Sequence, residues 1–178
     1  MAGFTREVAI RVFAQELRDS VLTHKDSDDQ FAPTYLITPT GARANRVFLV
    51  GTVTELDNIG SDTDYYKARI TDPTGSIHVY AGQYQPEAAR VLAGIEPPAF
   101  VAIVGKPSVF ETDDGTRITS IRVESAALVD KDTRDAWVKE AAELTTERIN
   151  GFNSPMALEH YGGDLTKYKE MVLNAIEG

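Results

Sequence analysis

The chain has 178 residues, of which 42% are hydrophobic and 25% charged, as in an ordinary globular protein with one hydrophobic core. It contains no cysteine, which excludes disulfide bonds and thiolate metal sites, and no stretch approaches the ~20 apolar residues of a membrane span. The net charge of -9 argues against indiscriminate nucleic-acid binding by the whole surface but leaves room for a local basic groove. Because Met1 to Glu7 lack the pattern of an export signal, we expect a cytosolic protein.

The N-terminal segment has the apolar spacing of an amphipathic helix. Its apolar side chains fall on one stripe, which comprises Ile10, Phe13, Leu17 and Val21. This stripe predicts a helix from Thr5 to Leu22, with Thr5 as its N-cap. Such a helix could pack on the main domain or bind a partner.

The next segment, residues 25–45, predicts a polar linker and an extended arm. Its acidic start lacks the glycine and the distal glutamate of a calcium loop, so we expect no metal site there. Pro33 and Pro39 are expected to exclude a central strand and to favour an extended chain with turns.

The middle of the chain predicts a series of strands. Runs that alternate apolar and polar residues, or are apolar throughout, cover Val47–Leu56, Tyr65–Ile70, Ile77–Tyr80, Phe100–Phe110 and Thr116–Leu128. Asp72-Pro73-Thr74-Gly75 and Asp113-Asp114-Gly115 predict hairpin turns. Gly51 is the expected bend in the first strand, and Gln85–Leu92 predicts a short helix with Pro86 in its first turn.

The C-terminal part predicts three helical pieces. The first covers Thr133–Asn150, is capped by Asp132 or Thr133 and ends at Gly151. A short piece follows Ser154-Pro155, and Asp164 caps the last helix. On the first helix, Trp137, Ala141 and Leu144 make one apolar stripe, which must pack on something.

The order of three strands, a short helix and two further strands is that of a five-stranded OB barrel, a fold whose strand 2–3 face binds oligonucleotides and oligosaccharides. We therefore expect a mainly β protein with flanking helices. The OB-fold barrel would occupy residues 46–130, between an N-terminal helix (1–24) with its arm (25–45) and a C-terminal helical tail (131–178).

Several stretches resemble one family. Leu36 to Ala42 and Asn45 to Gly51 resemble the opening of the archaeal proteins associated with replication protein A, and Asp72 to Gly75 and Tyr80 to Ala88 resemble their middle. The resemblance covers Tyr35 to Leu128 and extends, more distantly, to the small, middle subunit of eukaryotic replication protein A. It implies an OB fold, a nucleoid-associated role beside single-stranded DNA in replication and repair, and a complex with a larger single-strand-binding subunit.

Single-strand binding needs cations along a groove and aromatic faces on which bases stack. The residues predicted to supply them are Lys67, Arg69, His78, Tyr80, Lys106, Arg122, Arg43 and Arg46. A solvated charged face that binds nothing is the alternative interpretation.

Two features count against DNA contact. Related single-strand-binding OB domains often carry an aromatic residue two positions beyond Tyr80, where this chain has Gly82. The expected clamp loops are also acidic, with Asp57, Asp62 and Asp64 in the first and Glu111, Asp113 and Asp114 in the last, and acidic loops repel phosphate at low salt. The leading hypothesis is thus an accessory subunit that touches single-stranded DNA weakly, and the alternative is an assembly scaffold that does not contact DNA.

A helix directly after strand 5 is what the replication protein A subunits use to assemble, as the resemblance implies. Trp137, Ala141 and Leu144 are therefore predicted to bind the larger subunit, with packing on the chain's own barrel or N-terminal helix as the alternative. The three histidines, His24, His78 and His160, are isolated, and no nucleophile elbow, P-loop or dinucleotide turn occurs. We expect no enzyme activity, no cofactor and no small-molecule substrate.

Overall fold

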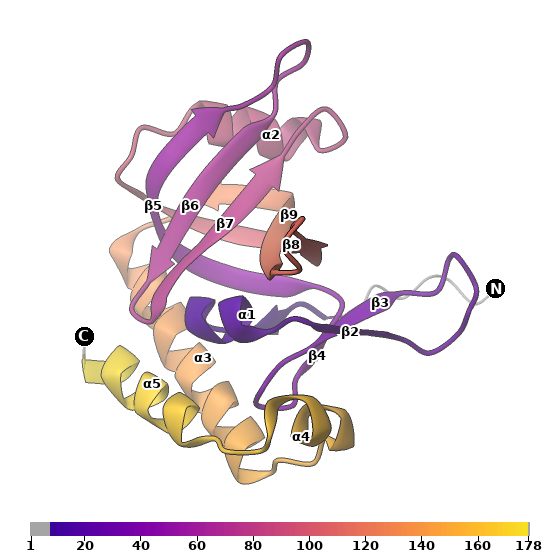
Figure 1. Cartoon of the computed structure of the whole chain (residues 1–178). Coiled ribbons are helices and arrows are strands. Elements are labelled where there is room, and N and C mark those ends of the chain that lie inside the picture. The colour runs from indigo at the N-terminus through magenta and orange to yellow at the C-terminus, as the bar shows by residue number, and fades with distance from the viewer. Residues whose placement is uncertain (1–7, 178) are drawn as a thin grey trace, which may run out of the picture.

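The structure is a computed structural model, which describes residues 8–177. At the centre of this part of the chain lies a closed barrel of five strands (Figure 1). They are β5 (Val47–Asn58), β6 (Tyr66–Asp72), β7 (Gly75–Ala81), β8 (Ala99–Glu111) and β9 (Arg117–Leu128). They pair in the order β5-β6-β7-β9-β8, and β8 pairs back with β5. With α2 (Pro86–Ala93) between β7 and β8, this is the OB topology that the order of elements predicted.

The first barrel strand, β5, belongs to both halves of the barrel. Val47–Val53 pair with β8, whereas Thr52–Asn58 pair with β6, and the register shifts between Val53 and Glu55. Gly51 lies at this changeover. A Cβ atom there would lie 2.7 Å from the carbonyl oxygen of Thr71, so glycine allows the close crossing of the two backbones that barrel closure needs.

The sequence predicted an N-terminal helix over Thr5–Leu22, and this extent is wrong. The described part of this segment forms β1 (Ile10–Arg11), α1 (Ala14–Asp19) and β2 (Leu22–Lys25), and the proposed cap Thr5 lies outside the described residues. β1 adds to the barrel sheet beside β5. The helix begins only at Ala14 because the Asp72 carboxylate, from the β6–β7 turn, accepts the Ala14 N–H at 2.7 Å.

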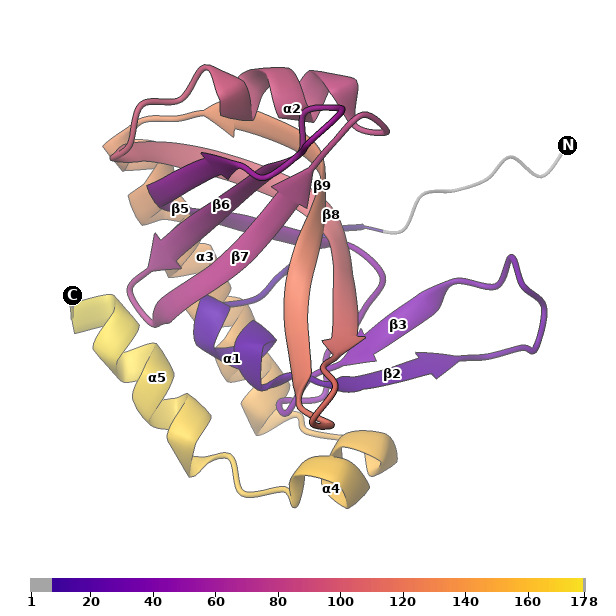
Figure 2. The same ribbon diagram turned by 45° about the horizontal axis from the view of Figure 1, so that its top comes forward.

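The expected arm also contains a strand that the prolines were expected to exclude. β3 (Thr34–Ile37) is the middle strand of a second sheet, between β2 and β4 (Arg43–Ala44). Pro33 and Pro39 lie just outside β3, where neither removes a ladder hydrogen bond. The β2–β3 hairpin projects from the barrel, as does the hairpin of β8 and β9 (Figure 2).

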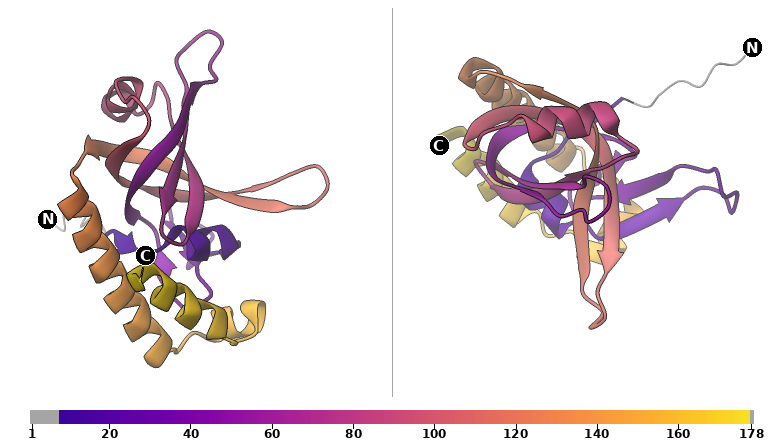
Figure 3. Two further views of the ribbon diagram at one scale, coloured as in Figure 1. Left: turned by 90° about the vertical axis from the view of Figure 1, so that its left-hand side faces the viewer. Right: turned by 90° about the horizontal axis from the view of Figure 1, so that it is seen from above.

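The C-terminal helices α3 (Lys131–Asn150), α4 (Pro155–Tyr161) and α5 (Thr166–Glu177) follow the barrel. The cap of α3 is Asp130, which accepts the Thr133 N–H, and not Asp132 or Thr133 as expected. Figure 3 shows α3 and α5 lying together on one side of the barrel. No helix in the described part of the chain is long and apolar enough to cross a membrane.

Candidate nucleic-acid interface

A row of outward side chains crosses four neighbouring strands of the barrel. The pairing register places it side by side on β6, β7, β9 and β8, as Lys67, Tyr80, Arg122 and Lys106. Residues that flank the row in sequence, such as Ala68, Val79 and Ile121, point inward and are buried, because side chains alternate between the two faces of a strand. Four of the predicted site residues therefore come together on one solvent-facing surface.

A second pair lies directly beside this row. Arg69 on β6 is opposite His78 on β7. The Arg69 side chain donates to the Thr54 hydroxyl at 3.1 Å and lies 3.5 Å from the Glu55 carboxylate, so part of its charge is compensated. Partial burial lowers the pKa of His78, and the cations Lys67, Arg69 and Arg18 lower it further, because a positive neighbourhood disfavours a protonated imidazole.

An aromatic pair stands at one end of the row. The rings of Tyr65 and Tyr80 are 5.9 Å apart between centroids, and Lys67 Nζ lies 6.0 Å from the Tyr80 ring. The Tyr65 ring lies over Gly82, where a Cβ atom would be 2.6 Å from Tyr65 Cδ2. Tyr65 thus provides an aromatic surface above the position where the sequence seemed to lack one. The outward alternation of Tyr65, Lys67 and Arg69 is the sequence signal that could have identified it.

The cations of this row are unpaired. Within residues 8–177, Lys67, Lys106 and Arg122 form no ion pair. In a chain with 27 acidic and 18 basic residues, unpaired cations gathered on one face make a local positive surface despite the negative net charge.

Two predicted site residues have acidic partners within the chain. Arg46 forms a two-pronged ion pair with Glu124, at 2.6 and 2.9 Å, and its side chain is only 11% exposed. Arg43 lies on β4, with its guanidinium 4.0 Å from the Tyr35 ring centroid, and pairs with Asp26. Both guanidinium groups are therefore engaged within the chain, unlike the cations of the row.

The acidic loops remain at the margins of the row. Asp64 accepts a hydrogen bond from the Asn58 side chain, and Asp114 accepts bonds from Thr112 and from the Thr116 N–H inside the β8–β9 turn. These hydrogen bonds lower the pKa of Asp114. Both carboxylates therefore also serve local turn structure.

The apolar stripe of α3 faces the barrel. Trp137 is 2% exposed and Ala141 is fully buried. The indole packs edge-on against Phe13, with ring centroids 5.4 Å apart, and donates to the carbonyl of Phe48 at 3.0 Å. Leu144 is half-buried on the same helix. The stripe therefore packs on the chain's own barrel and N-terminal segment, which was the alternative to a partner-binding role. Trp137 and Ala141 are not available to a partner in this fold.

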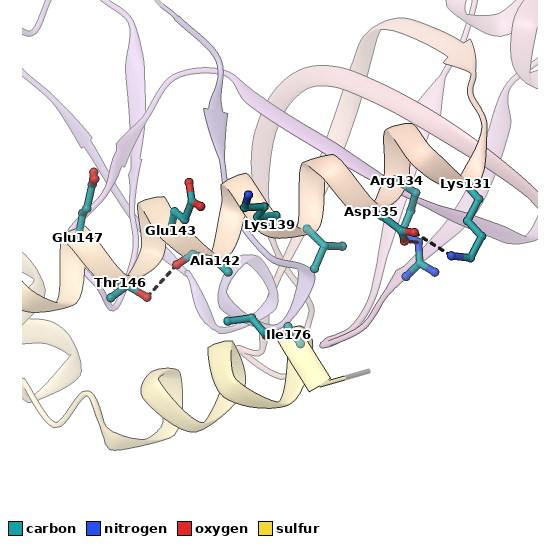
Figure 4. Close-up of a pocket in the computed structure, with 11 residues that line it drawn as sticks. Lys131, Arg134, Asp135, Lys139, Ala142, Glu143, Thr146, Glu147 and Ile176 are labelled. Carbon is teal, nitrogen blue, oxygen red and sulfur yellow. Dashed lines mark hydrogen bonds and ion pairs between the residues drawn. The ribbon is translucent and has the colours of Figure 1, made fainter.

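The opposite side of α3 carries a groove instead. It has a volume of about 810 Å³ and lies between α3 and the end of α5. Val138, Ala142, Ala175 and Ile176 supply its apolar part, and charged residues such as Lys139 and Glu143 border it (Figure 4). This groove is a second candidate binding surface, which the sequence pattern did not predict.

The strand order and the position of α2 define this chain as an OB-fold protein. No protein-family model and no curated protein matches the sequence. Among solved structures, the chain is similar to the second single-stranded DNA binding protein of Mycobacterium smegmatis, with a TM-score of 0.41, 18% identity and coverage of 47% of this chain and 84% of that one. It is also similar to a mitochondrial single-stranded DNA binding protein from S. cerevisiae, with a TM-score of 0.37, 22% identity and coverage of 48% and 92%. An OBody bound to hen egg-white lysozyme gives a TM-score of 0.41 at 18% identity, over 48% of this chain and 81% of that one.

Proposed function

We propose that this protein binds single-stranded DNA on the face formed by Lys67, Tyr80, Arg122 and Lys106, with Tyr65 beside it, and acts as a binding protein rather than an enzyme. The observation that carries the proposal is the row itself: unpaired cations and an aromatic ring side by side across four strands. Cations follow the phosphates of a strand, and aromatic faces stack on its unpaired bases.

The arrangement favours single strands over duplex. Tyr80 lies on β7, and Tyr65, which is 43% exposed, directly precedes β6. A base can stack on such a ring only when it is unpaired and has left the stack of its own helix. Duplex DNA would offer this surface phosphates alone. We therefore expect a higher affinity for an unpaired oligonucleotide than for a hairpin of the same charge.

The test is fluorescence anisotropy with a labelled single-stranded oligonucleotide over a range of salt concentrations. Stacking contributes ~1–3 kcal/mol per base, so Tyr80→Ala is expected to weaken binding about fivefold to 150-fold. Lys67→Ala and Arg122→Ala should each reduce the salt slope by about 0.7, the value for one lost phosphate contact on a single strand. Phe31→Ala, an exposed aromatic residue in the β2–β3 loop, is the matched control. Unchanged affinity in the triple variant Lys67→Ala/Tyr80→Ala/Arg122→Ala would contradict the proposal.

We further propose that the chain is an accessory subunit that joins a larger single-strand-binding subunit through the groove between α3 and α5. The motif resemblance to the archaeal proteins associated with replication protein A supports such a partner. The groove offers an apolar floor with charges of both signs at its border, which suits an amphipathic helix. Replication and repair at the nucleoid would then be the setting of the complex.

This second role has a matched pair of variants on α5. Ile176 lines the groove and is 61% exposed, whereas Leu173 is 59% exposed but does not line it. A larger subunit identified by pull-down from native extract would be titrated with both variants. Ile176→Asp is expected to weaken the complex at least tenfold, about 1.4 kcal/mol, and Leu173→Asp to leave it unchanged. A complex that forms while the chain binds no DNA would favour the assembly scaffold instead.

A further inference from the structure

A basic groove lies between α1, the start of β7 and the start of β9. Its volume is about 510 Å³, and its polar lining comprises Arg18, Arg69, Ser76, His78, Arg117 and Thr119. None of the described residues that line it is acidic. The lining holds three arginines, of which Arg69 is partly compensated by Glu55 outside the lining. A concave surface with this excess of positive charge is suited to an anion.

The fold positions the arginine of α1 at this groove. Asp72 and Thr74 of the β6–β7 turn accept the N–H groups of Ala14 and Gln15, at 2.7 and 3.0 Å, so the first turn of α1 is attached to the barrel. Arg18 follows one turn later, and a Cβ atom on Gly75 would lie 4.0 Å from its Nη1 atom. Arg18 is exposed and forms no ion pair with any residue in 8–177.

The opposite wall is supplied by the β8–β9 hairpin. Arg117 donates to the carbonyl of Val21 at 3.5 Å, which joins the start of β9 to the segment after α1. Beside it Ile118, which is 48% exposed, lines the groove and pairs with Phe110, which is 62% exposed. The rim therefore offers an apolar surface next to the cations.

The groove opens directly onto the candidate DNA face. Arg69 and His78 line the groove and also lie next to the row of Lys67 and Tyr80. We propose that one strand of DNA continues from this row into the groove, where Arg18 and Arg117 bind its phosphodiester backbone, so that the N-terminal helix α1 forms part of the DNA site. This inference rests on the proposed function and extends it to a longer strand.

Strand length separates the two parts of the site. OB folds occupy roughly 4–16 nucleotides, so an oligonucleotide of about 4 nucleotides would fill the row alone and one of about 15 would reach the groove. The test measures the binding of both oligonucleotides to wild-type protein and to the double variant Arg18→Gln/Arg117→Gln. For the long oligonucleotide, loss of two phosphate contacts should reduce the salt slope by about 1.4 and weaken binding roughly 25-fold at ~0.1 M salt. Binding of the short one should be nearly unchanged.

The control Lys25→Gln/Lys169→Gln removes the same charge from exposed lysines of β2 and α5 that form no ion pair within residues 8–177. If the double variant unfolds, the single variant Arg18→Gln, which changes only an exposed side chain, is measured in its place. If the long oligonucleotide binds both double variants equally, the groove is not on the path, although the proposed function stands. If the wild-type protein binds neither oligonucleotide, the proposed function fails and this inference with it.

Discussion

Tyr65, which directly precedes β6, and Gly82, which directly follows β7, form a pair in which the Tyr65 ring lies over the Gly82 backbone. The ring has room only because residue 82 has no Cβ atom, which would lie 2.6 Å from Tyr65 Cδ2. Seen in sequence alone, Gly82 looks like the loss of a stacking residue. In the fold, the missing Cβ atom makes room for the ring of Tyr65, the residue that directly precedes β6.

Gly82→Ala tests this pair. The added methyl group meets ring atoms of Tyr65, which is 43% exposed, and no backbone atom, so we expect little change in stability and a shifted Tyr65 ring. Binding of single-stranded DNA should weaken about as much as in Tyr65→Ala, by ~1–3 kcal/mol for one lost stacking contact. The double variant should lose no more than either single variant, because both remove the same contact. Additive losses, measured by anisotropy, would show that the two residues act separately.

His78 predicts a pH-dependent affinity. Its pKa lies below 6.5 in the free protein because of partial burial and the cations around it, with Glu55 opposing them. A bound phosphate favours the protonated imidazole, so the pKa of His78 is higher in the complex than in the free protein. The affinity should therefore rise as the pH falls through the pKa that His78 has in the complex, by up to about tenfold for each unit of pKa difference between complex and free protein.

His78→Gln should remove this rise, whereas His160→Gln, on α4, should keep it. Titration of both variants in the same buffers checks the assignment. An identical pH profile in wild-type protein and His78→Gln would mean that no phosphate lies near the imidazole.

At the scale of elements, α1 is short but contacts the barrel and the helical tail. Its Glu16 is fully buried and accepts hydrogen bonds from Thr40, and the Arg148 guanidinium of α3 lies 3.6 Å from the Glu16 carboxylate. Tyr168 of α5 donates to Asp19 at 2.8 Å. The ends of α1 are thus determined by residues far away in the sequence. This explains why the prediction from the local apolar stripe made the helix too long.

Asp72→Ala tests the attachment of α1 to the barrel. The change removes the acceptor of the Ala14 N–H at a buried site, and an unsatisfied buried donor costs about 1–3 kcal/mol. We expect the free energy of unfolding to fall by about that amount in denaturant titrations. Asp113→Ala, an exposed change in the β8–β9 turn, should have an effect within about 0.5 kcal/mol. Equal stability of the two variants would mean that the Asp72 contact does not hold the helix.

The barrel could be predicted from sequence because its information is local. The alternation of Lys67, Ala68 and Arg69 and the two turns define strands, faces and hairpins without knowledge of distant contacts. The second sheet was missed because β3 has only four residues, Thr34–Ile37, between two prolines, and its partners β2 and β4 have only four and two residues. Similarly, Arg46 looked available because its partner Glu124 is 78 positions away.

At the scale of the whole molecule, one hydrophobic core joins the N-terminal segment, the barrel and the helical tail. Phe13, Ile103, Trp137 and Val172 belong to the same buried cluster. Tail and barrel are therefore not independent layers, and changes in α3 should be felt as changes in folding stability.

Trp137→Ala tests this dependence. Loss of a buried tryptophan typically costs 3–5 kcal/mol, and the carbonyl of Phe48 also loses its hydrogen bond. We expect a clear fall in the free energy of unfolding of the isolated protein, measured by denaturant titration. Leu173→Ala, an exposed change on α5, serves as the control. A variant with unchanged stability would show that α3 does not pack on the barrel as described.

The contact between Phe13 and Trp137 also has a consequence in time. A ribosome makes Phe13 about 120 residues before Trp137, which at about 5–20 residues per second corresponds to roughly 6–25 s. Throughout that interval Val12, Phe13 and Leu17, all fully buried in the finished protein, have no completed core to enter. The nascent chain therefore presents an apolar segment early in synthesis, and molecular chaperones that hold such segments would act on this region first.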